Sequence, residues 1–173
     1  MSISGITTAT QYLTYTLGSE TFALDIVNVR EVLDYPNVTL VPNMPDYVLG
    51  VINLRGSVVP VVDLRTRFNM PRNDKTLNSC VIISEVHVDG ETAILGALAD
   101  SVQEVVDLEP NQIEAAPKIG TRLRNDFIRG MGKHNDRFII ILDFDRVFSA
   151  SDVTLAGSLA AESGISPIVQ SAA

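Results

Sequence analysis

The sequence has little of what most enzymes and secreted proteins need. It contains one cysteine, two histidines and no tryptophan in 173 residues. The single cysteine, Cys80, excludes an internal disulfide and is typical of a reducing compartment. The two histidines, His87 and His134, are far apart and do not supply the paired spacing of a zinc site. We therefore expect no metal, no cofactor and no catalytic residue.

Long apolar runs and clusters of positive charge are missing too. The longest apolar stretch, residues 93–99, contains a glycine and is far shorter than the roughly 20 residues of a membrane helix. The first ten residues show neither a basic leader nor an apolar segment, so we expect no secretory signal. The net charge of −8 includes no basic cluster that would hold phosphates. We expect a cytoplasmic protein without nucleic-acid binding or membrane insertion.

Short apolar segments separated by turn residues make up most of the chain. Asp89-Gly90 is a strong hairpin signal, and Gly18-Ser19-Glu20 and His134-Asn135-Asp136 divide other apolar segments in the same way. Asp63 and Asp143 follow two such segments and are expected to cap short helical turns; a catalytic pair is the less favoured alternative. The pattern predicts an all-β protein of small barrels or a sandwich. The expected strands include residues 12–17, 22–26, 81–88, 92–98 and 138–142.

The chain also repeats itself weakly. Residues 48–68 align without a gap on 128–148, an offset of 80, and residues 29–34 align on 102–107, an offset of 73. Two blocks in the same order favour an internal duplication. We expect one domain over residues 10–150, made of two related barrels with repeat blocks 29–68 and 102–148. Outside it we expect disordered ends at 1–9 and 162–173, and a short C-terminal helix over 151–161.

A charged pair, Arg55-Gly56, lies between two apolar strands in GVINLRGSVVPVVDLRTRF (50–68). The ordinary interpretation is a solvated turn. Pro60, inside the second strand, predicts an edge strand or a bulge. If a pseudo-two-fold axis relates the barrels, a cleft lined by valines would suit a partner helix, with Glu31 and Arg55 at its rim. The alternative is that these valines belong to the core. The valines are Val29, Val102 and Val105.

The same stretch, with VREVLDY before it and LVPNMPDYVLG between, resembles the CheW family of bacterial chemotaxis adaptors. The resemblance covers about residues 10 to 150 and extends weakly to FALDIVNVREVLD, VQEVVDLEPNQIEAAP and GMG. It implies two intertwined SH3-like five-stranded β-barrels and no catalytic activity. It also implies two partners: the cytoplasmic tips of methyl-accepting chemoreceptors, and the regulatory domain of the histidine kinase CheA. The adaptor would then be recruited to receptor arrays at the inner membrane.

The resemblance further implies a receptor-binding site in which Arg55 is central. An exposed arginine beside an aliphatic cleft can lay its stem on a helix and donate to carboxylates or carbonyls. A scaffold for a non-motility kinase pathway and a small-molecule-binding module stay open as alternatives, and so does weak self-association in array rings. The implied site residues are Val29, Glu31, Asn53, Arg55, Val102 and Val105.

Overall fold

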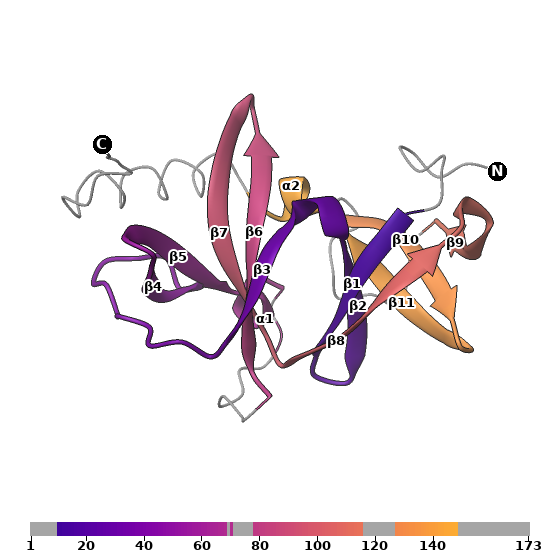
Figure 1. The fold of residues 1–173 in the computed structure, drawn as a ribbon, viewed down its shortest axis with the longest axis horizontal. Helices are drawn as coiled ribbons and strands as arrows, with labels where there is room; N and C mark the ends of the chain where they lie inside the picture. Colours follow the sequence, from indigo (N-terminus) through magenta and orange to yellow (C-terminus); the bar gives the residue numbers. More distant parts are fainter. Residues whose placement is uncertain (1–9, 69, 71–77, 116–126, 149–173) are drawn as a thin grey trace.

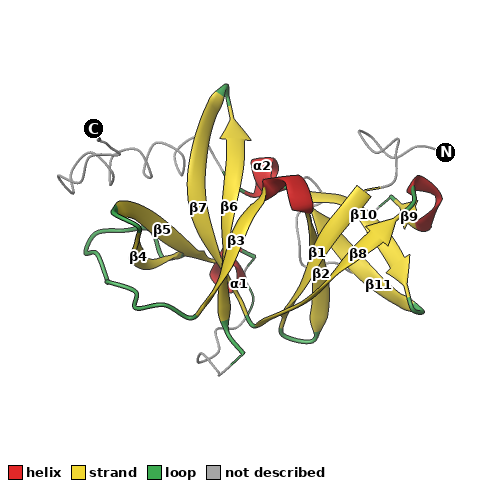
Figure 2. Ribbon diagram, in the orientation of Figure 1, coloured by secondary structure: helices red, strands yellow, loops and turns green. Residues whose placement is uncertain are grey.

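The computed structural model describes residues 10–68, 70, 78–115 and 127–148 (Figure 1). In this part of the chain strands dominate, and the helices are single turns (Figure 2). The expected disordered ends and the expected C-terminal helix over 151–161 lie outside the described residues. The strands are β1 (Thr10–Leu17), β2 (Glu20–Asp25), β3 (Val29–Asp34), β4 (Val48–Leu54), β5 (Ser57–Asp63), β6 (Cys80–Val88), β7 (Glu91–Ala99), β8 (Ser101–Leu108), β9 (Ile113–Glu114), β10 (Ile128–His134) and β11 (Arg137–Leu142). The helical turns are η1 (Ile26–Asn28), α1 (Leu64–Arg67), η2 (Pro110–Gln112) and α2 (Phe144–Val147).

The strands form two curled sheets that lie side by side (Figure 1). Barrel one has the strand order β8-β1-β2-β11-β10-β9, and barrel two has the order β3-β6-β7-β5-β4. Barrel one therefore takes two strands from before barrel two and four from after it, which intertwines the two barrels along the chain. Each sheet contains one parallel pair, β2 with β11 and β7 with β5, and its other pairs are antiparallel.

The internal duplication is confirmed by the strand order. The run β8-β1-β2-β11-β10 of barrel one matches β3-β6-β7-β5-β4 of barrel two, position by position. The correspondence extends to the outer edges, because Thr39 forms a bridge with Val51 of β4 and Glu114 pairs with Met131 of β10. Val51 and Met131 are related by the offset of 80 found in the sequence. The two barrels are thus copies of one supersecondary unit.

One large apolar core is shared between the barrels. A row of aromatic rings runs through it, with centroids 5.9 Å apart for Tyr15 and Phe22, 6.2 Å for Phe22 and Phe68, and 5.9 Å for Phe68 and Phe127. The same cluster includes Ile82 of barrel two. Each barrel adds only a small cluster of its own. Because small barrels bury little surface alone, the shared core accounts for their joint stability.

Both predicted helix caps are confirmed. The Asp63 carboxylate accepts a hydrogen bond from the Arg65 backbone N–H at 3.0 Å, and Asp143 accepts one from Asp145 N–H at 3.1 Å. Thr66 Oγ1 also donates to Asp63 at 3.2 Å. These contacts satisfy amides that the first helical turn leaves without a partner. The two carboxylates thus have structural roles at matching places in the two barrels.

The prediction that Pro60 marks an edge strand or a bulge is wrong. Its strand, β5, lies between β7 and β4, and the irregularity falls on β4 between Val48 and Gly50. Pairing of β5 with β7 begins only at Val61. Pro60 therefore lies just before the two-sided part of the strand, where its missing N–H removes no rung of that ladder.

Candidate functional site

The β4–β5 hairpin places Arg55 at an exposed tip with an unusual backbone. Leu54 pairs with Ser57, so the turn has two residues, Arg55 and Gly56, with φ of 51° and 89°. Two positive φ values define the turn type whose right-handed twist suits a tight hairpin, and asparagine, aspartate or glycine usually occupies it. For arginine the left-handed conformation costs about 1 kcal/mol or more. The local backbone therefore does not explain why an arginine stands here.

The Arg55 side chain forms an ion pair with Glu31. Its Nη1 lies 3.4 Å from Glu31 Oε1, and its Nη2 contacts Oε2. Glu31 is on β3 and Arg55 follows β4, and these strands are the two edges of the sheet of barrel two. The pair therefore bridges the edges where the sheet curls toward closure. The hydrogen bond from the Arg55 guanidinium lowers the pKa of the Glu31 carboxyl below its ordinary value.

The Asn53 side chain stabilises the turn. Its Oδ1 accepts a hydrogen bond from the Gly56 backbone N–H at 2.8 Å. Such a contact mimics a backbone turn and fixes the conformation of the tip. Asn53, Glu31 and Arg55 therefore form one structural unit, which we call the Arg55 tip. At this tip the guanidinium stays accessible, since 72% of the Arg55 side chain is exposed against 29% for Glu31.

The three valines of the predicted site occupy different environments. Val29 on β3 and Val102 on β8 are half-buried, and both pack against the shared core at the junction. Val105, also on β8, is 47% exposed on barrel one. The structure thus brings Glu31, Asn53 and Arg55 together in barrel two. It places Val29 and Val102 at matching points along the junction and leaves Val105 on the outer surface.

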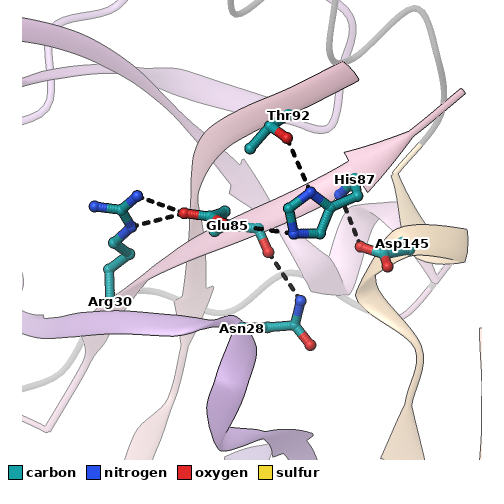
Figure 3. Close-up of polar contacts among 6 residues, drawn as sticks. All are labelled: Asn28, Arg30, Glu85, His87, Thr92 and Asp145. Carbon is teal, nitrogen blue, oxygen red and sulfur yellow. Dashed lines mark hydrogen bonds and ion pairs between the residues drawn. The ribbon is translucent and has the colours of Figure 1, made fainter. Parts of the chain in front are cut away.

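A polar network on the outer side of β3 and β6 was not apparent in the sequence (Figure 3). Arg30 Nε donates to Glu85 Oε1 at 3.0 Å, and His87 Nε2 lies 3.4 Å from Glu85 Oε2. The His87 ring also contacts Thr92, with Nδ1 and Oγ1 2.9 Å apart. The backbone N–H of His87 donates to Asp145 Oδ1 at 2.8 Å. The network therefore fixes β3, which carries Glu31, against β6 and links both to α2 of the other copy.

In the part of the chain that the structure describes, no three histidine, cysteine, aspartate or glutamate side chains converge as ligands for a metal ion. Cys80 is half-buried, and its Sγ donates to the Asn78 carbonyl at 3.0 Å. No helix among these residues is long and apolar enough to cross a membrane.

Comparison with known proteins agrees with this geometry. The family model of the CheW-like domain matches residues 11–152. A chemotaxis protein CheW of Klebsiella aerogenes is 32% identical over 91% of this chain and 93% of its own, and one of Bacillus subtilis is 30% identical over 82% and 88%. The crystal structure of the scaffolding protein TtCheW from Thermoanaerobacter tengcongensis superposes with a TM-score of 0.72 at 33% identity, covering 82% of this chain and 88% of that one. The chain therefore belongs to the CheW family of chemotaxis adaptors, as the NLRG and VPVVDLR motifs predicted.

Proposed function

We propose that this protein is a non-catalytic adaptor that couples methyl-accepting chemoreceptors to the histidine kinase CheA. It works in the cytoplasm and is recruited to receptor arrays at the inner membrane. The single observation that carries the proposal is the Arg55 tip, an exposed arginine held by Glu31 at a turn that disfavours arginine. Because the relatives carry chemotaxis names, we favour this function over a scaffold for a non-motility pathway.

The receptor contact is centred on the Arg55 tip. The guanidinium has donors beyond those that Glu31 occupies, because arginine presents five N–H groups in a planar fork. These can donate to carboxylates or to carbonyls at the end of a receptor helix, while the stem lies on apolar side chains. Glu31 limits the rotation of the side chain and so reduces the entropy lost on binding. We assign Glu31, Asn53 and Arg55 to the centre of this contact, and Val29 and Val102 at the junction and Val105 on barrel one to its extension toward the other barrel.

The kinase uses a different surface. Two partners that shared one patch would compete, and a coupling protein must hold both at once. Exposed apolar side chains suited to another barrel include Val27 on η1, at 78% exposure, and Phe138 on β11, at 56%. Each surface is small, so we expect micromolar affinities, about −8 kcal/mol each. Assembly then depends on many weak contacts made together.

The test compares Arg55→Ala with Arg30→Ala. Both arginines are exposed and both pair with a glutamate across the sheet, Arg55 with Glu31 and Arg30 with Glu85. Only Arg55 lies at the hairpin tip. We expect Arg55→Ala to weaken binding to a receptor cytoplasmic fragment about tenfold, which is the loss of one charge-assisted contact, and Arg30→Ala to leave it unchanged. Equal effects of the two variants, measured by calorimetry, would remove the Arg55 tip from the receptor contact.

A further inference from the structure

Barrel one has an open polar groove at the place that corresponds to the Arg55 tip. Its volume is about 180 Å³, and β1, β2, β8 and the β10–β11 hairpin form its walls. We call it the Glu104 groove. Its polar lining includes Thr14, Thr21, Glu104, His134, Asn135 and Arg137.

The duplication relates this groove to the Arg55 tip residue by residue. The offset of 73 places Glu104 where Glu31 stands, and the offset of 80 places Asn135 where Arg55 stands. The two turns share their backbone, since φ is 52° at Asn135 and 51° at Arg55. Asparagine is the residue that this conformation favours, but its side chain is much shorter than that of arginine. Asn135 therefore does not bring a guanidinium to Glu104 as Arg55 does to Glu31; Arg137 also lines the groove, and it forms no ion pair with Glu104 among the described residues.

The Glu104 backbone is held by hydrogen bonds, whereas its carboxylate is unpaired among the described residues. Thr14 Oγ1 donates to the Glu104 carbonyl at 2.7 Å and accepts from the Glu104 N–H at 3.1 Å, which fixes the main chain where β1 and β8 are irregular. Among the described residues no side chain forms an ion pair with the Glu104 carboxylate. Barrel one thus presents an exposed glutamate on a hydrogen-bonded stretch of backbone in an open groove, whereas barrel two pairs the equivalent glutamate with its own arginine.

We propose that the Glu104 groove binds an arginine side chain of a partner polypeptide, which supplies in trans what Arg55 supplies in barrel two. A carboxylate can accept two parallel hydrogen bonds from a guanidinium, and the pair is specific in geometry as well as charge. Arg137 and His134, from the β10–β11 hairpin, also line the groove. These groups disfavour a bare cation and favour an arginine whose neighbouring carbonyl or carboxylate oxygens face them. The occupant is therefore a segment in which an acidic residue follows the arginine.

This inference does not rest on the proposed function, because the isolated chain is sufficient to test it. The probe is the capped dipeptide N-acetyl-arginyl-aspartate amide, titrated into the ¹⁵N-labelled full chain. Its control is the same dipeptide with citrulline, which has the same shape but no charge. We expect saturable shifts of the Thr14, Glu104 and Asn135 amides with the arginine peptide, and about tenfold weaker binding of the citrulline peptide.

Three variants locate the contact. Glu104→Gln keeps the shape of the side chain. It should lower the affinity for the arginine peptide to that for the citrulline peptide. Asn135→Arg should fill the groove with its own guanidinium and abolish binding, whereas Asn135→Ala should retain it. The same spectra report whether each variant is folded. The proposal is overturned if the two peptides bind the wild-type chain equally, or if the arginine peptide causes no saturable shift at Glu104; neither result depends on a variant.

Discussion

The two barrels share a backbone plan and differ in the side chains attached to it. Both hairpin tips adopt the same two-residue turn, but barrel two places Arg55 there and barrel one places Asn135. Barrel two closes its edges with the Arg55–Glu31 ion pair, and barrel one leaves the corresponding groove open. Backbone hydrogen bonding and packing therefore determine the fold that the two barrels share, whereas their surface side chains have diverged.

The junction between the barrels shows the same divergence. The offset of 80 relates the buried Arg65 on α1 to Asp145 on α2. Arg65 forms an ion pair with Asp100, which also accepts the Gly18 N–H at 2.7 Å. Asp145 accepts the His87 N–H at 2.8 Å (Figure 3). Each helical turn thus secures a hairpin of the other barrel, α1 through a partly buried charge pair with Asp100, which binds Gly18, and α2 through a single hydrogen bond.

The largest expected effect is at Arg65. Arg65→Ala leaves the Asp100 carboxylate without its cation in a partly buried site, and we expect a loss of about 3 kcal/mol in the free energy of unfolding. Asp145→Ala, at the matching place, removes one hydrogen bond and should cost about 1 kcal/mol. Urea denaturation of both variants measures the difference. If Asp145→Ala lowers the free energy of unfolding as much as Arg65→Ala does, the two junction contacts are equivalent and the proposed difference between them is wrong.

Exchanging the tip residues tests the turn comparison. Arg55→Asn introduces the residue that the left-handed turn favours, so we expect the protein to be as stable as wild type or up to about 1 kcal/mol more stable. Asn135→Arg should lose up to about 1 kcal/mol, less any gain from pairing with Glu104. Thermal unfolding of both proteins provides the values. A marked destabilisation by Arg55→Asn would mean that the arginine is needed for the fold.

The two barrels also differ in the core, at one pair of equivalent buried polar residues. Tyr15 and Ser84 hold equivalent places, since they pair with Val102 and Val29 respectively, and neither is exposed. Ser84 Oγ donates to the Ile82 carbonyl at 3.3 Å, but the Tyr15 hydroxyl has no partner among the described residues. Tyr15→Phe should therefore be neutral or stabilise by about 1 kcal/mol. If urea unfolding shows that Tyr15→Phe lowers the free energy of unfolding by more than about 1 kcal/mol, the Tyr15 hydroxyl does have a hydrogen-bond partner.

The smallest effect is a titration at the Arg55 tip. The Arg55 guanidinium lowers the pKa of Glu31, and the Arg30 guanidinium lowers that of Glu85. A carboxyl with a lowered pKa stabilises the fold above its unfolded pKa and loses that contribution as the pH falls through its folded pKa. In Arg55→Ala the Glu31 pKa should rise to its ordinary value while Glu85 stays low. Carboxyl NMR measures both, and an unchanged Glu31 pKa would show that the ion pair does not form in solution.

Much of the fold was predictable because it depends on interactions between residues close together in the sequence. Asp89-Gly90 and the caps at Asp63 and Asp143 act over a few residues, and the two offsets recorded the duplication. The pairing of β2 with β11 and the contact of His87 with Asp145 join residues far apart in sequence, and no local pattern encodes such contacts. Pro60 was misassigned for the same reason, since the sequence does not show where pairing with β7 begins.

The candidate site was predictable only in part. Glu31 and Arg55 were identified, but their ion pair depends on the curling of the sheet that brings β3 near the β4–β5 tip. The Glu104 groove was missed because its character comes from what Asn135 lacks relative to Arg55. The offset of 80 aligns Asn135 with Arg55, so a comparison of the two hairpin tips in the sequence would have identified this difference. Their roles in binding stay predictions.

The most direct test of the account is a titration of the CheA regulatory domain into a preformed complex of this protein with a receptor cytoplasmic fragment. If the protein couples the two partners, a ternary complex forms in which the receptor stays bound, measured by analytical ultracentrifugation with a labelled receptor fragment. Arg55→Asn should weaken binding of the receptor fragment about tenfold and leave binding of the kinase domain unchanged. Stoichiometric displacement of the receptor by the kinase domain would contradict the account, because the two partners would then share one surface and the protein could not couple them.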